Sequence, residues 1–478
     1  MSTKNFYITT TLPYINAEPH IGFAAEIIKA DVIARYEREQ GKGVFFNTGT
    51  DEHGLKIYRK AQEQKIDPQA YCDEYAKKFD KLKTALNLSY NNFIRTTDPH
   101  HIAAAQEFWQ RCARNGDIYK KNYQVKYCVG CELEKTESEL VDGCCPFHPQ
   151  QELEIINEEN YFFKFSKYQG PLLKFYDSHQ DFVVPAHRFH EINNFVAAGL
   201  QDFSISRLKE KMPWGIEVPG DESQVMYVWF DALINYISAL GWPEDEQKFK
   251  DFWPGIQVCG KDNLRQQTAM WQAMLMSAGL PNSLQVLIFG FISANGQKIS
   301  KSTGNTVDPL DLVKKYGVEA TRYYLLKEIS TFEDGDFSIE KLEKLYNADL
   351  ANGLGNLVAR TSNLIEKNGL ELNLKDNSDA GLLGLFKTRM AEYNFSEALK
   401  VLWDKIRESD EFLSRTTPWK MTDREEIKKV LVVVAQNILN IALLLKPFLP
   451  ETAEKISVQF KNNHITKGEI LFQRLWKK

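Results

Sequence analysis

The chain has 478 residues, too many for one simple hydrophobic core, so we expect about two to four domains. Its formal net charge of -5 excludes a surface coated in basic charge for indiscriminate nucleic-acid binding. The first residues lack the apolar core of a signal peptide, and the most apolar run, VLVVVAQNILNIALLL, is interrupted by Gln436, Asn437 and Asn440. We therefore expect a cytoplasmic protein that does not enter a membrane.

Two short strands and a helix are predicted near the start of the chain. Residues 6–12 (FYITTTL) and 44–48 (VFFNT) are β-branched and aromatic, as is typical of strands. Between them, apolar side chains recur at steps of three and four residues, at Ile21, Ala25, Ile28, Val32 and Tyr36. Strand, helix and strand in this order predict two parallel strands. The same alternation returns with GIQVCGKDN (255–263) and LQVLIFGFI (284–292).

The fold class predicted from this order is α/β, a doubly wound parallel sheet split by an insertion and followed by helices. The stretch between the two halves is rich in cysteines and aromatic residues, and the residues after about 346 have helical periodicity. The predicted segments are the first half of the sheet domain (1–116), the insert (117–225), the second half (226–292), a loop and connecting region (293–345) and a helical bundle (346–478).

Four of the seven cysteines lie between Cys128 and Cys145, which favours a metal site in a reducing compartment over a disulfide framework. YCVGC supplies Cys128 and Cys131, and CCPFH supplies His148 with either Cys144 or Cys145. Two short-spaced pairs joined by a short loop are typical of a closed, tetrahedral, structural zinc site. We therefore expect one zinc ion, with the third ligand open between the two neighbouring cysteines.

Polar residues and glycines gather where the predicted strands end. They occur in LPY (12–14), GTDEHG (49–54), GKD (260–262) and GFISANG (290–296). The carboxyl ends of parallel strands meet at one edge of a sheet, where doubly wound folds bind ligands. This layout is typical of a nucleotide site.

Two further motifs suggest phosphate chemistry. His20 begins a helix and offers an imidazole and backbone N–H groups to an anion, while Gly22 lacks a side chain that would block the approach. In KISKS (298–302), Lys298 and Lys301 can both close over a polyphosphate. Taken alone, the first motif is better explained as a capping histidine and the second as a solvated loop.

Together and in this order, PHIGF and KISKS resemble the two signature motifs of class I aminoacyl-tRNA synthetases. With LPYINAEPHIG, GTDEHG, YVWFDALINY and GKDN, nearly the whole chain looks like the methionyl-tRNA synthetase family. The resemblance implies a Rossmann-like catalytic domain, a zinc-bearing connective insert and an α-helical anticodon-binding bundle. It also implies attack of the methionine carboxylate on the ATP α-phosphate, followed by transfer of the methionyl group to the 3′-terminal adenosine of tRNA.

The family's partners and cofactors follow from the same resemblance. The expected partners are ATP, L-methionine and tRNA(Met), and the expected cofactors are one structural Zn2+ and Mg2+ bound with ATP. The chain ends soon after the bundle, so we expect a monomer without the additional carboxyl-terminal domain of some relatives. The Cys-x-x-His spacing of one-zinc relatives favours Cys145 over Cys144 as the third zinc ligand.

The resemblance also assigns site residues by position. The expected catalytic residues are His20, Lys298 and Lys301. The expected ATP-binding residues are Tyr14, His20, Gly22, Glu26, Gly260, Asp262 and Lys301. The expected methionine-binding residues are Leu12, Tyr14, Asp51, Trp229, Ala232, Leu233, Tyr236 and Gln267. Anticodon reading is expected from Asn356, Arg360 and Trp419. Taken alone, Trp419 would be a half-buried aromatic residue, and the alternative to base stacking is a core position between bundle helices.

Three positions depart from the family pattern. Phe23 and Gln267 stand where most relatives carry histidines, and Ile299 replaces a methionine in the second signature motif. The first two departures motivate an alternative, a non-catalytic RNA-binding paralogue. A valine, leucine or isoleucine synthetase is disfavoured because the insert is too short for a large editing domain. A small-molecule adenylate-forming ligase would have no use for the helical bundle.

Overall fold

The structure is a computed structural model that describes residues 4–131, 133–135, 139–294, 296–298, 307–375 and 379–475. The chain forms two compact units. The first, which we call the sheet unit, comprises Met1–Pro19, Gly41–Lys83 and Ser89–Phe289. The second, which we call the helical unit, comprises His20–Gln40, Thr84–Leu88 and Gly290–Lys478. The five predicted segments do not follow these units, because His20–Gln40 and Thr84–Leu88 fall within the first predicted segment, and they stay a prediction.

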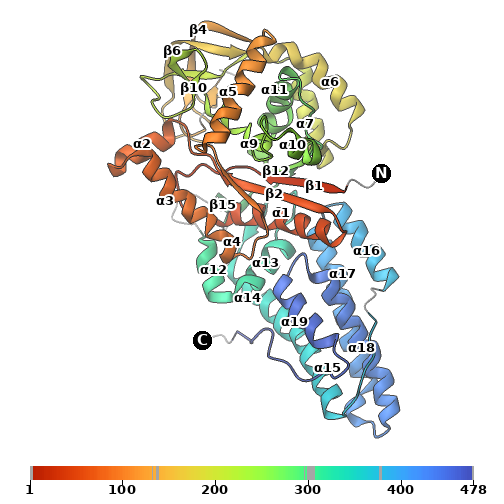
Figure 1. The fold of residues 1–478 in the computed structure, drawn as a ribbon. Coiled ribbons are helices and arrows are strands. Elements are labelled where there is room, and N and C mark those ends of the chain that lie inside the picture. Colours follow the sequence, from red (N-terminus) through yellow and green to blue (C-terminus); the bar gives the residue numbers. More distant parts are fainter. Residues whose placement is uncertain are drawn as a thin grey trace. The chain divides into compact units, whose positions relative to one another are not determined.

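A six-stranded parallel sheet forms the centre of the sheet unit (Figure 1). Its strands lie in the order β3 (Asn92–Arg95), β2 (Gly43–Thr50), β1 (Asn5–Thr10), β12 (Ile256–Gly260), β13 (Gln285–Phe289) and β7 (Val183–Val184). β1 pairs in parallel with both β2 and β12, which confirms the predicted pairing of the two halves. The edge strand β7 comes from within the predicted insert, and no sequence pattern predicts this two-residue strand.

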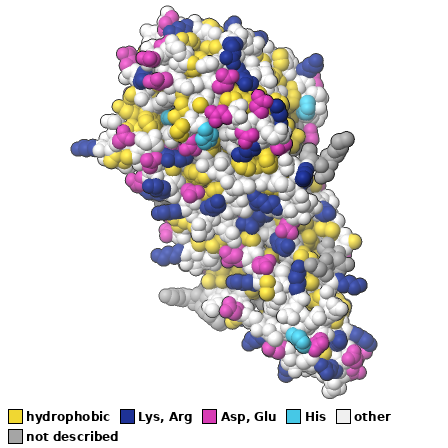
Figure 2. Space-filling view, in the orientation of Figure 1, with side chains coloured by type: hydrophobic (Ala, Val, Ile, Leu, Met, Phe, Trp, Pro, Cys, Tyr) yellow, Lys and Arg dark blue, Asp and Glu magenta, His cyan; other side chains and the backbone are white. Residues whose placement is uncertain are grey.

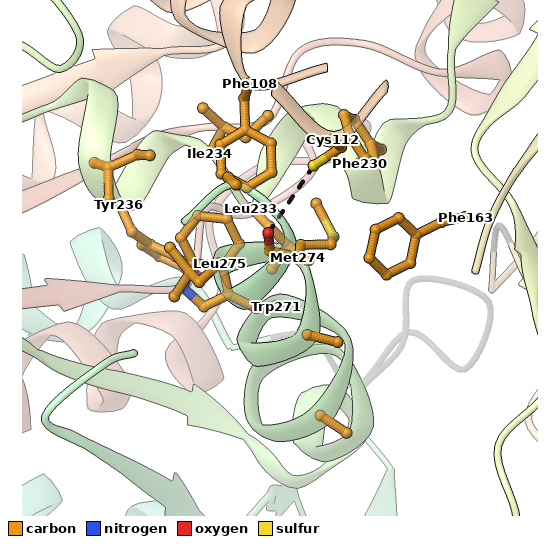
Figure 3. Close-up of a cluster of buried hydrophobic side chains, with 14 of the residues drawn as sticks. Phe108, Cys112, Phe163, Phe230, Leu233, Ile234, Tyr236, Trp271, Met274 and Leu275 are labelled. Atoms are coloured by element: carbon orange, nitrogen blue, oxygen red, sulfur yellow. Dashed lines mark hydrogen bonds between the residues drawn. The ribbon is translucent and has the colours of Figure 1, made fainter. Parts of the chain in front are cut away.

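Helices of the sheet unit bury a large aromatic core (Figure 3). Phe108, on α5 (Pro99–Arg114), stacks on Trp271 of α11 (Trp271–Ser277), with ring centroids 5.6 Å apart. Phe230, on α8 (Val228–Ala232), meets the Phe108 ring edge-on at 5.9 Å. The remaining helices are α2 (Leu55–Gln64), α3 (Pro68–Asp80), α6 (Gln169–Ser178), α7 (Ala186–Ala197), α9 (Asn235–Ser238) and α10 (Glu246–Phe252). This core fixes α5, α8 and α11 beside one another.

The predicted insert contributes two antiparallel sheets. The larger has the order β5 (Leu133–Lys135), β4 (Ile118–Cys128), β6 (Glu154–Phe163) and β8 (Phe203–Ser204). The smaller has the order β10 (Glu217–Val218), β11 (Asp221–Met226) and β9 (Ser206–Leu208). Because β4 ends at Cys128, the longer sheet leads directly into the cysteine-rich loop.

The helical unit consists mainly of helices (Figure 1). They are α1 (Ile21–Glu39), α12 (Pro309–Tyr316), α13 (Val318–Lys327), α14 (Ile339–Leu345), α15 (Asn356–Lys367), α16 (Ala380–Ala391), α17 (Phe395–Thr416), α18 (Arg424–Leu445) and α19 (Pro450–Phe460). A small sheet of β15 (Gln297–Lys298), β14 (Ile292–Ala294) and β16 (Gly335–Phe337) accompanies them. On the face in Figure 2, Lys and Arg side chains are interspersed with Asp and Glu over these helices.

Polar contacts to three segments explain why α1 belongs to the helical unit. Arg322, on α13, is fully buried and donates to the Asp31 carboxylate at 2.8 Å. Its Nε also donates to the carbonyl of Phe448 at 2.8 Å. Further along α1, the ammonium of Lys29 donates to the carbonyl of Ser330 at 2.7 Å. These contacts hold the helix that follows β1 in the chain against α13 and against Ser330, which comes soon after α13.

Of the described helices, α18 alone is long and apolar enough to cross a membrane by length and composition. It packs against α15, α17 and α19, and most of its apolar window is buried. Its buried residues include Leu431, Val434, Ile438 and Leu445. Burial by neighbouring helices accounts for this composition.

Candidate active site

The loops after β1 and β2 meet beyond the carboxyl ends of these strands. Tyr14 and Asp51 pair as an isolated parallel bridge. The Asp51 N–H donates to the carbonyl of Pro13 at 3.0 Å, and the Ile15 N–H donates to the carbonyl of Asp51 at 3.4 Å. Asp51 is only 3% exposed. Backbone pairing thus fixes a buried carboxylate beside an aromatic ring at the edge where the fold binds ligands.

The side chain of Trp229, on α8, lies beside this point. The rings of Tyr14 and Trp229 meet edge-on, with centroids 6.4 Å apart. Leu12 packs with Ile94 and Ala239 in a small buried cluster. The other predicted pocket residues of this part of the chain, Ala232, Leu233 and Tyr236, are all buried. Aromatic edges and a close apolar fit suit a flexible thioether side chain.

Gln267 lies on a π-helical turn, Gln266–Met270, immediately before α11. Its amide nitrogen donates to the hydroxyl of Tyr236 at 2.5 Å, and its amide oxygen accepts from Gln257 at 3.0 Å. The backbone carbonyl of Gln267 accepts from Gln272 at 2.9 Å. Extra residues in a helical turn often occur at functional sites because they redirect side chains. Here the turn presents an amide that locks the orientation of Tyr236.

The GTDEHG loop is held by partners that no local sequence pattern predicts. The Glu52 carboxylate accepts from Arg95 at 2.7 and 2.8 Å and from the Thr97 hydroxyl at 2.5 Å. His53, the next residue, contacts the Asp231 carboxylate at 2.6 Å. At Gly49 a Cβ atom would lie 1.8 Å from the carbonyl oxygen of Ile94, so only glycine fits there. Consecutive residues of this loop are therefore anchored to different elements.

A buried arginine, Arg207, lies beside the aromatic residues that pack against Trp229, and no sequence motif predicts it. The guanidinium of Arg207 lies over the Tyr227 ring, 4.3 Å from its centroid, and over the Tyr127 ring at 5.4 Å. Its Nη1 donates to the Ser204 hydroxyl at 2.7 Å. Tyr127 and Tyr227 form a cluster against which Trp229 packs. Arg207 therefore supports the surroundings of the predicted pocket.

The first signature motif forms the amino end of α1. His20 caps the helix, and its Nδ1 accepts from the Gly22 N–H at 3.1 Å. A Cβ atom at Gly22 would lie 2.9 Å from the His20 ring, so glycine leaves room for the imidazole itself as well as for a ligand. Phe23 and Glu26 are partly buried on the following turn. The backbone N–H groups of this helix start favour an anion.

The other predicted ATP-binding residues lie in different segments. Gly260 ends β12, and Asp262 is exposed in the 3-10 turn Lys261–Asn263. The backbone of Lys298 pairs with Ser293 in the small sheet of the helical unit. The side chain of Lys298 and the whole of Lys301 lie outside the described residues, so their predicted roles rest on sequence alone.

The four predicted zinc ligands converge at one point of the insert. The ligand atoms of Cys128, Cys131, Cys145 and His148 all lie within 4.8 Å of one another. The Cys131 thiol lies 3.4 Å from that of Cys145 and 3.2 Å from His148 Nδ1. Ligands at about 2.0–2.3 Å from a tetrahedral zinc lie at such separations. Cys144 is not part of the group, so the geometry favours Cys145.

The predicted anticodon residues gather on one surface of the helical unit. Asn356 and Arg360 share a face of α15, just after a π-helical segment at Tyr346–Gly355. The Arg360 guanidinium lies over the Trp419 ring, 5.4 Å from its centroid, and donates to Asp410 at 2.6 Å. Trp419 is 46% exposed, which contradicts the alternative that it packs between the bundle helices.

This arrangement agrees with the class that the sequence motifs predicted, a class I aminoacyl-tRNA synthetase, and the comparison with known families shows the same class. Residues 6–155 and 148–362 match the family model described as tRNA synthetases class I (M). The chain is 44% identical to the methionine–tRNA ligase of Thermosynechococcus vestitus, across 95% of this chain and 89% of that one. It is 41% identical to that of Synechocystis sp., across 96% and 90%.

A solved structure agrees with these sequence relatives. It is the methionyl-tRNA synthetase of Mycobacterium tuberculosis in complex with methionyl-adenylate, with a TM-score of 0.89 and 37% identity over 95% of this chain and 93% of that one. The chain belongs to the methionyl-tRNA synthetase family. The predicted family, α/β fold class, enzyme class and methionine–tRNA ligase function are confirmed.

Proposed function

We propose that the pocket formed by Tyr14, Asp51 and Trp229 binds L-methionine for this reaction. The observation that carries the proposal is the buried Asp51 carboxylate, paired through its backbone with Tyr14, whose ring meets Trp229. A carboxylate beside aromatic edges suits a substrate with an ammonium group next to a thioether. Leu12, Ala232, Leu233, Tyr236 and Gln267 complete the pocket, and Gln267 acts by fixing the hydroxyl of Tyr236.

ATP binds, in this proposal, through groups at strand ends and at the start of α1. Asp262 and the backbone of Gly260 receive the ribose, and Tyr14 and Glu26 contribute further contacts. His20, Lys298 and Lys301 stabilise the charge that develops on the phosphates as the methionine carboxylate attacks the α-phosphate. Gly22 keeps the helix start open to the phosphates. Mg2+ enters with ATP, where it neutralises phosphate charge.

The Cys3His cluster holds one structural Zn2+, as its donor set and spacing support. The metal would pin the cysteine-rich loop to the end of β4. Asn356, Arg360 and Trp419 contact the anticodon of tRNA(Met), and the half-exposed indole of Trp419 is available to stack on an unpaired base. The protein acts as a monomer in the cytoplasm.

Methionine-dependent ATP–pyrophosphate exchange tests the activation step. Exchange with a panel of amino acids should select methionine, and Lys301→Ala should nearly abolish exchange while methionine affinity stays close to normal, because the lysine acts on charge that develops during the reaction. Absence of methionine-dependent exchange would favour the non-catalytic RNA-binding alternative. Equal losses of affinity and turnover in Lys301→Ala would contradict the role given to that residue.

Elemental analysis tests the zinc site. We expect one zinc per chain, lost in Cys128→Ser or His148→Ala and retained in the matched control Cys144→Ser. Loss of the metal should loosen the insert and reduce transfer to tRNA more than exchange. Purified protein without zinc would overturn the proposal, and retention of the metal in Cys145→Ser would move the third ligand to Cys144.

A further inference from the structure

A fully buried carboxylate in the sheet unit is held by two histidines from distant parts of the chain. Asp231 lies on α8, between Trp229 and Ala232 in sequence, and has no exposed surface. One of its oxygens lies 2.6 Å from His53 Nδ1, and the other lies 2.8 Å from His101 Nε2. His101 is itself fully buried, and its Nδ1 lies 2.8 Å from the Ser238 hydroxyl. The reaction as proposed above uses none of these three titratable groups.

The hydrogen-bond pattern fixes which groups donate. An ionised carboxylate only accepts, so each histidine must present an N–H to Asp231. Burial alone would raise the pKa of Asp231, but His53 and His101 outweigh it and lower this pKa. Asp231 is therefore a buried anion with one donor on each oxygen. Removal of either donor leaves a carboxylate oxygen unsatisfied in a site that water does not reach.

The two histidines lie in different segments, His53 in the GTDEHG loop and His101 on α5. His53 lies two residues after Asp51, in a loop whose other anchor is the Glu52 carboxylate bound by Arg95. The indole of Trp214 covers the His53 ring, with centroids 5.6 Å apart, and donates to the carbonyl of Glu52 at 2.6 Å. His101 lies on α5 and reaches α9 through Ser238. Asp231 therefore joins the GTDEHG loop, α5, α8 and α9.

This junction connects the two halves of the methionine pocket. Asp51, which receives the ammonium group in the proposal, lies on the loop that His53 holds. Trp229, Ala232 and Leu233, which form the side-chain wall, surround Asp231 on α8. Within the described residues, the hydrogen bond between His53 and Asp231 joins the GTDEHG loop directly to α8.

We infer that His53 and Asp231 are positioning residues for methionine, and that their hydrogen bond sets the separation between the ammonium-binding carboxylate and the wall that selects the side chain. This inference rests on the proposed methionine pocket. If the bond is lost, the carboxylate and the wall are no longer held at one distance. Methionine should then bind less tightly, and amino acids of similar length should be rejected less well, while ATP binding is unaffected.

Two amide substitutions at position 53 distinguish loss of the hydrogen bond to Asp231 from a change in side-chain packing. In His53→Asn the amide nitrogen falls near the position of Nδ1 and can still donate to Asp231, whereas in His53→Gln it falls near the position of Nε2. We expect His53→Gln to raise the KM for methionine about tenfold or more in pyrophosphate exchange, as for a lost bond to a charged group. His53→Asn should stay within about threefold of the unsubstituted enzyme, and the KM for ATP should be unchanged in both.

Selectivity gives a second readout. Norleucine has a methylene in place of the sulfur, and ethionine is one methylene longer than methionine. The ratio of kcat/KM for methionine to that for each analogue should fall in His53→Gln and remain in His53→Asn. A role limited to stability would lower the melting temperature without changing this ratio.

A matched control is offered by Asp117, another buried carboxylate of the sheet unit with several partners. Asp117 is fully buried and accepts from Tyr168 at 2.5 Å and from Ser277 at 2.8 Å, with no bond to a proposed pocket residue. Tyr168→Phe should lower the melting temperature and leave the KM for methionine unchanged. An unchanged methionine KM in a folded His53→Gln variant, or an equal rise in Tyr168→Phe, would overturn the inference.

The failure of the pocket assignment itself has a different signature. Trp229→Ala removes a proposed wall residue without touching Asp231, and it should raise the methionine KM. If it does not, the pocket is wrongly placed, whatever His53 does. If Trp229→Ala raises the KM while His53→Gln and His53→Asn behave alike, the pocket stands and the positioning role of His53 is wrong.

Discussion

The two units place their functional groups in opposite ways. In the sheet unit the polar groups around the candidate methionine pocket are buried, as Glu52, Asp231 and Gln267 are, and each has several partners. In the helical unit the candidate anticodon residues are accessible, and Trp419 is 46% exposed. A small substrate is recognised by preorganised groups in a closed pocket, whereas an unpaired base needs a side chain that it can reach.

In the helical unit, different residues are therefore expected to determine stability and binding. In the sheet unit, the same residues are expected to contribute to both. The buried ion pair of the helical unit, Arg322 with Asp31, involves none of the candidate anticodon residues. In the sheet unit, Asp231 is both a buried charge and a neighbour of the pocket wall in sequence. Substitutions in the helical unit should therefore affect either stability or tRNA binding, and those near the pocket should affect both stability and methionine use.

The largest effect is expected from Arg322→Met. The guanidinium is fully buried and also donates to the carbonyl of Phe448, so its loss leaves that carbonyl without this donor and leaves the Asp31 carboxylate with Arg35 as its remaining cationic partner. Removal of one partner from a buried ion pair typically costs about 3–5 kcal/mol, and we expect a loss near the lower value because Arg35 still contacts Asp31. Chemical denaturation should show this loss of unfolding free energy in the variant.

The matched control is a more exposed ion pair whose acidic partner also lies on α1. Lys446 contacts Glu39 of α1 at 3.2 Å, with both side chains partly exposed, and such pairs contribute about 0–1 kcal/mol. Lys446→Met should therefore change the denaturation midpoint little. Equal losses in the two variants would mean that burial of the Arg322 pair is not what stabilises the helical unit.

The next largest effect is expected on tRNA binding, with no change in the stability of the fold. Trp419→Ala should remove a stacking contact of about 1–3 kcal/mol, so aminoacylation efficiency should fall about ten- to hundredfold, mostly through tRNA affinity. Pyrophosphate exchange without tRNA and the thermal melt should be unchanged, because the indole is half exposed.

A second tryptophan of the helical unit provides the contrast. The ring of Trp403 is tilted against that of Tyr323, with centroids 4.5 Å apart, and its indole donates to the carbonyl of Asp349 at 3.2 Å. Trp403→Ala should lower the melt, since it leaves a cavity in the bundle. If Trp419→Ala lowers the melt to a similar degree, or leaves charging intact, the anticodon role of Trp419 is wrong.

Sequence predicts the parts of this protein whose signals are local. The spacing of apolar residues predicts α1, and the spacing of Cys128, Cys131, Cys145 and His148 predicts a cluster that the fold brings together. Asp231 illustrates what sequence alone does not predict, because its partners His53 and His101 are 178 and 130 residues away. Such pairs exist only once the sheet and α5 are packed, and a histidine in isolation gives no sign of its partner.

The same reasoning explains the π-helical turns. Gln267 is predicted to line the pocket from its position in the family pattern, but its bond to Tyr236 depends on an additional residue in the turn Gln266–Met270. Helical periodicity over so short a stretch does not distinguish this turn from a regular α-helix. The residue is thus assigned from sequence, while the geometry that makes it useful becomes visible only in the folded chain.

The smallest effect is expected at the start of α1, which belongs to the helical unit by its contacts but carries a motif proposed for ATP. Phe23 lies three residues after His20, on the same face of the helix, and is partly buried. Phe23→His adds a second imidazole beside the helix start, where backbone N–H groups favour phosphate. We expect the KM for ATP to fall about two- to tenfold, as for one additional hydrogen bond.

The KM for methionine and the affinity for tRNA should not change, and Phe23→Leu, which keeps an apolar side chain without an imidazole, should leave the KM for ATP near its original value. A large loss of exchange in both variants would show that the Phe23 ring packs a wall that this chain needs, and the start of α1 would then resemble the pocket in the sheet unit, where packing and binding depend on the same side chains.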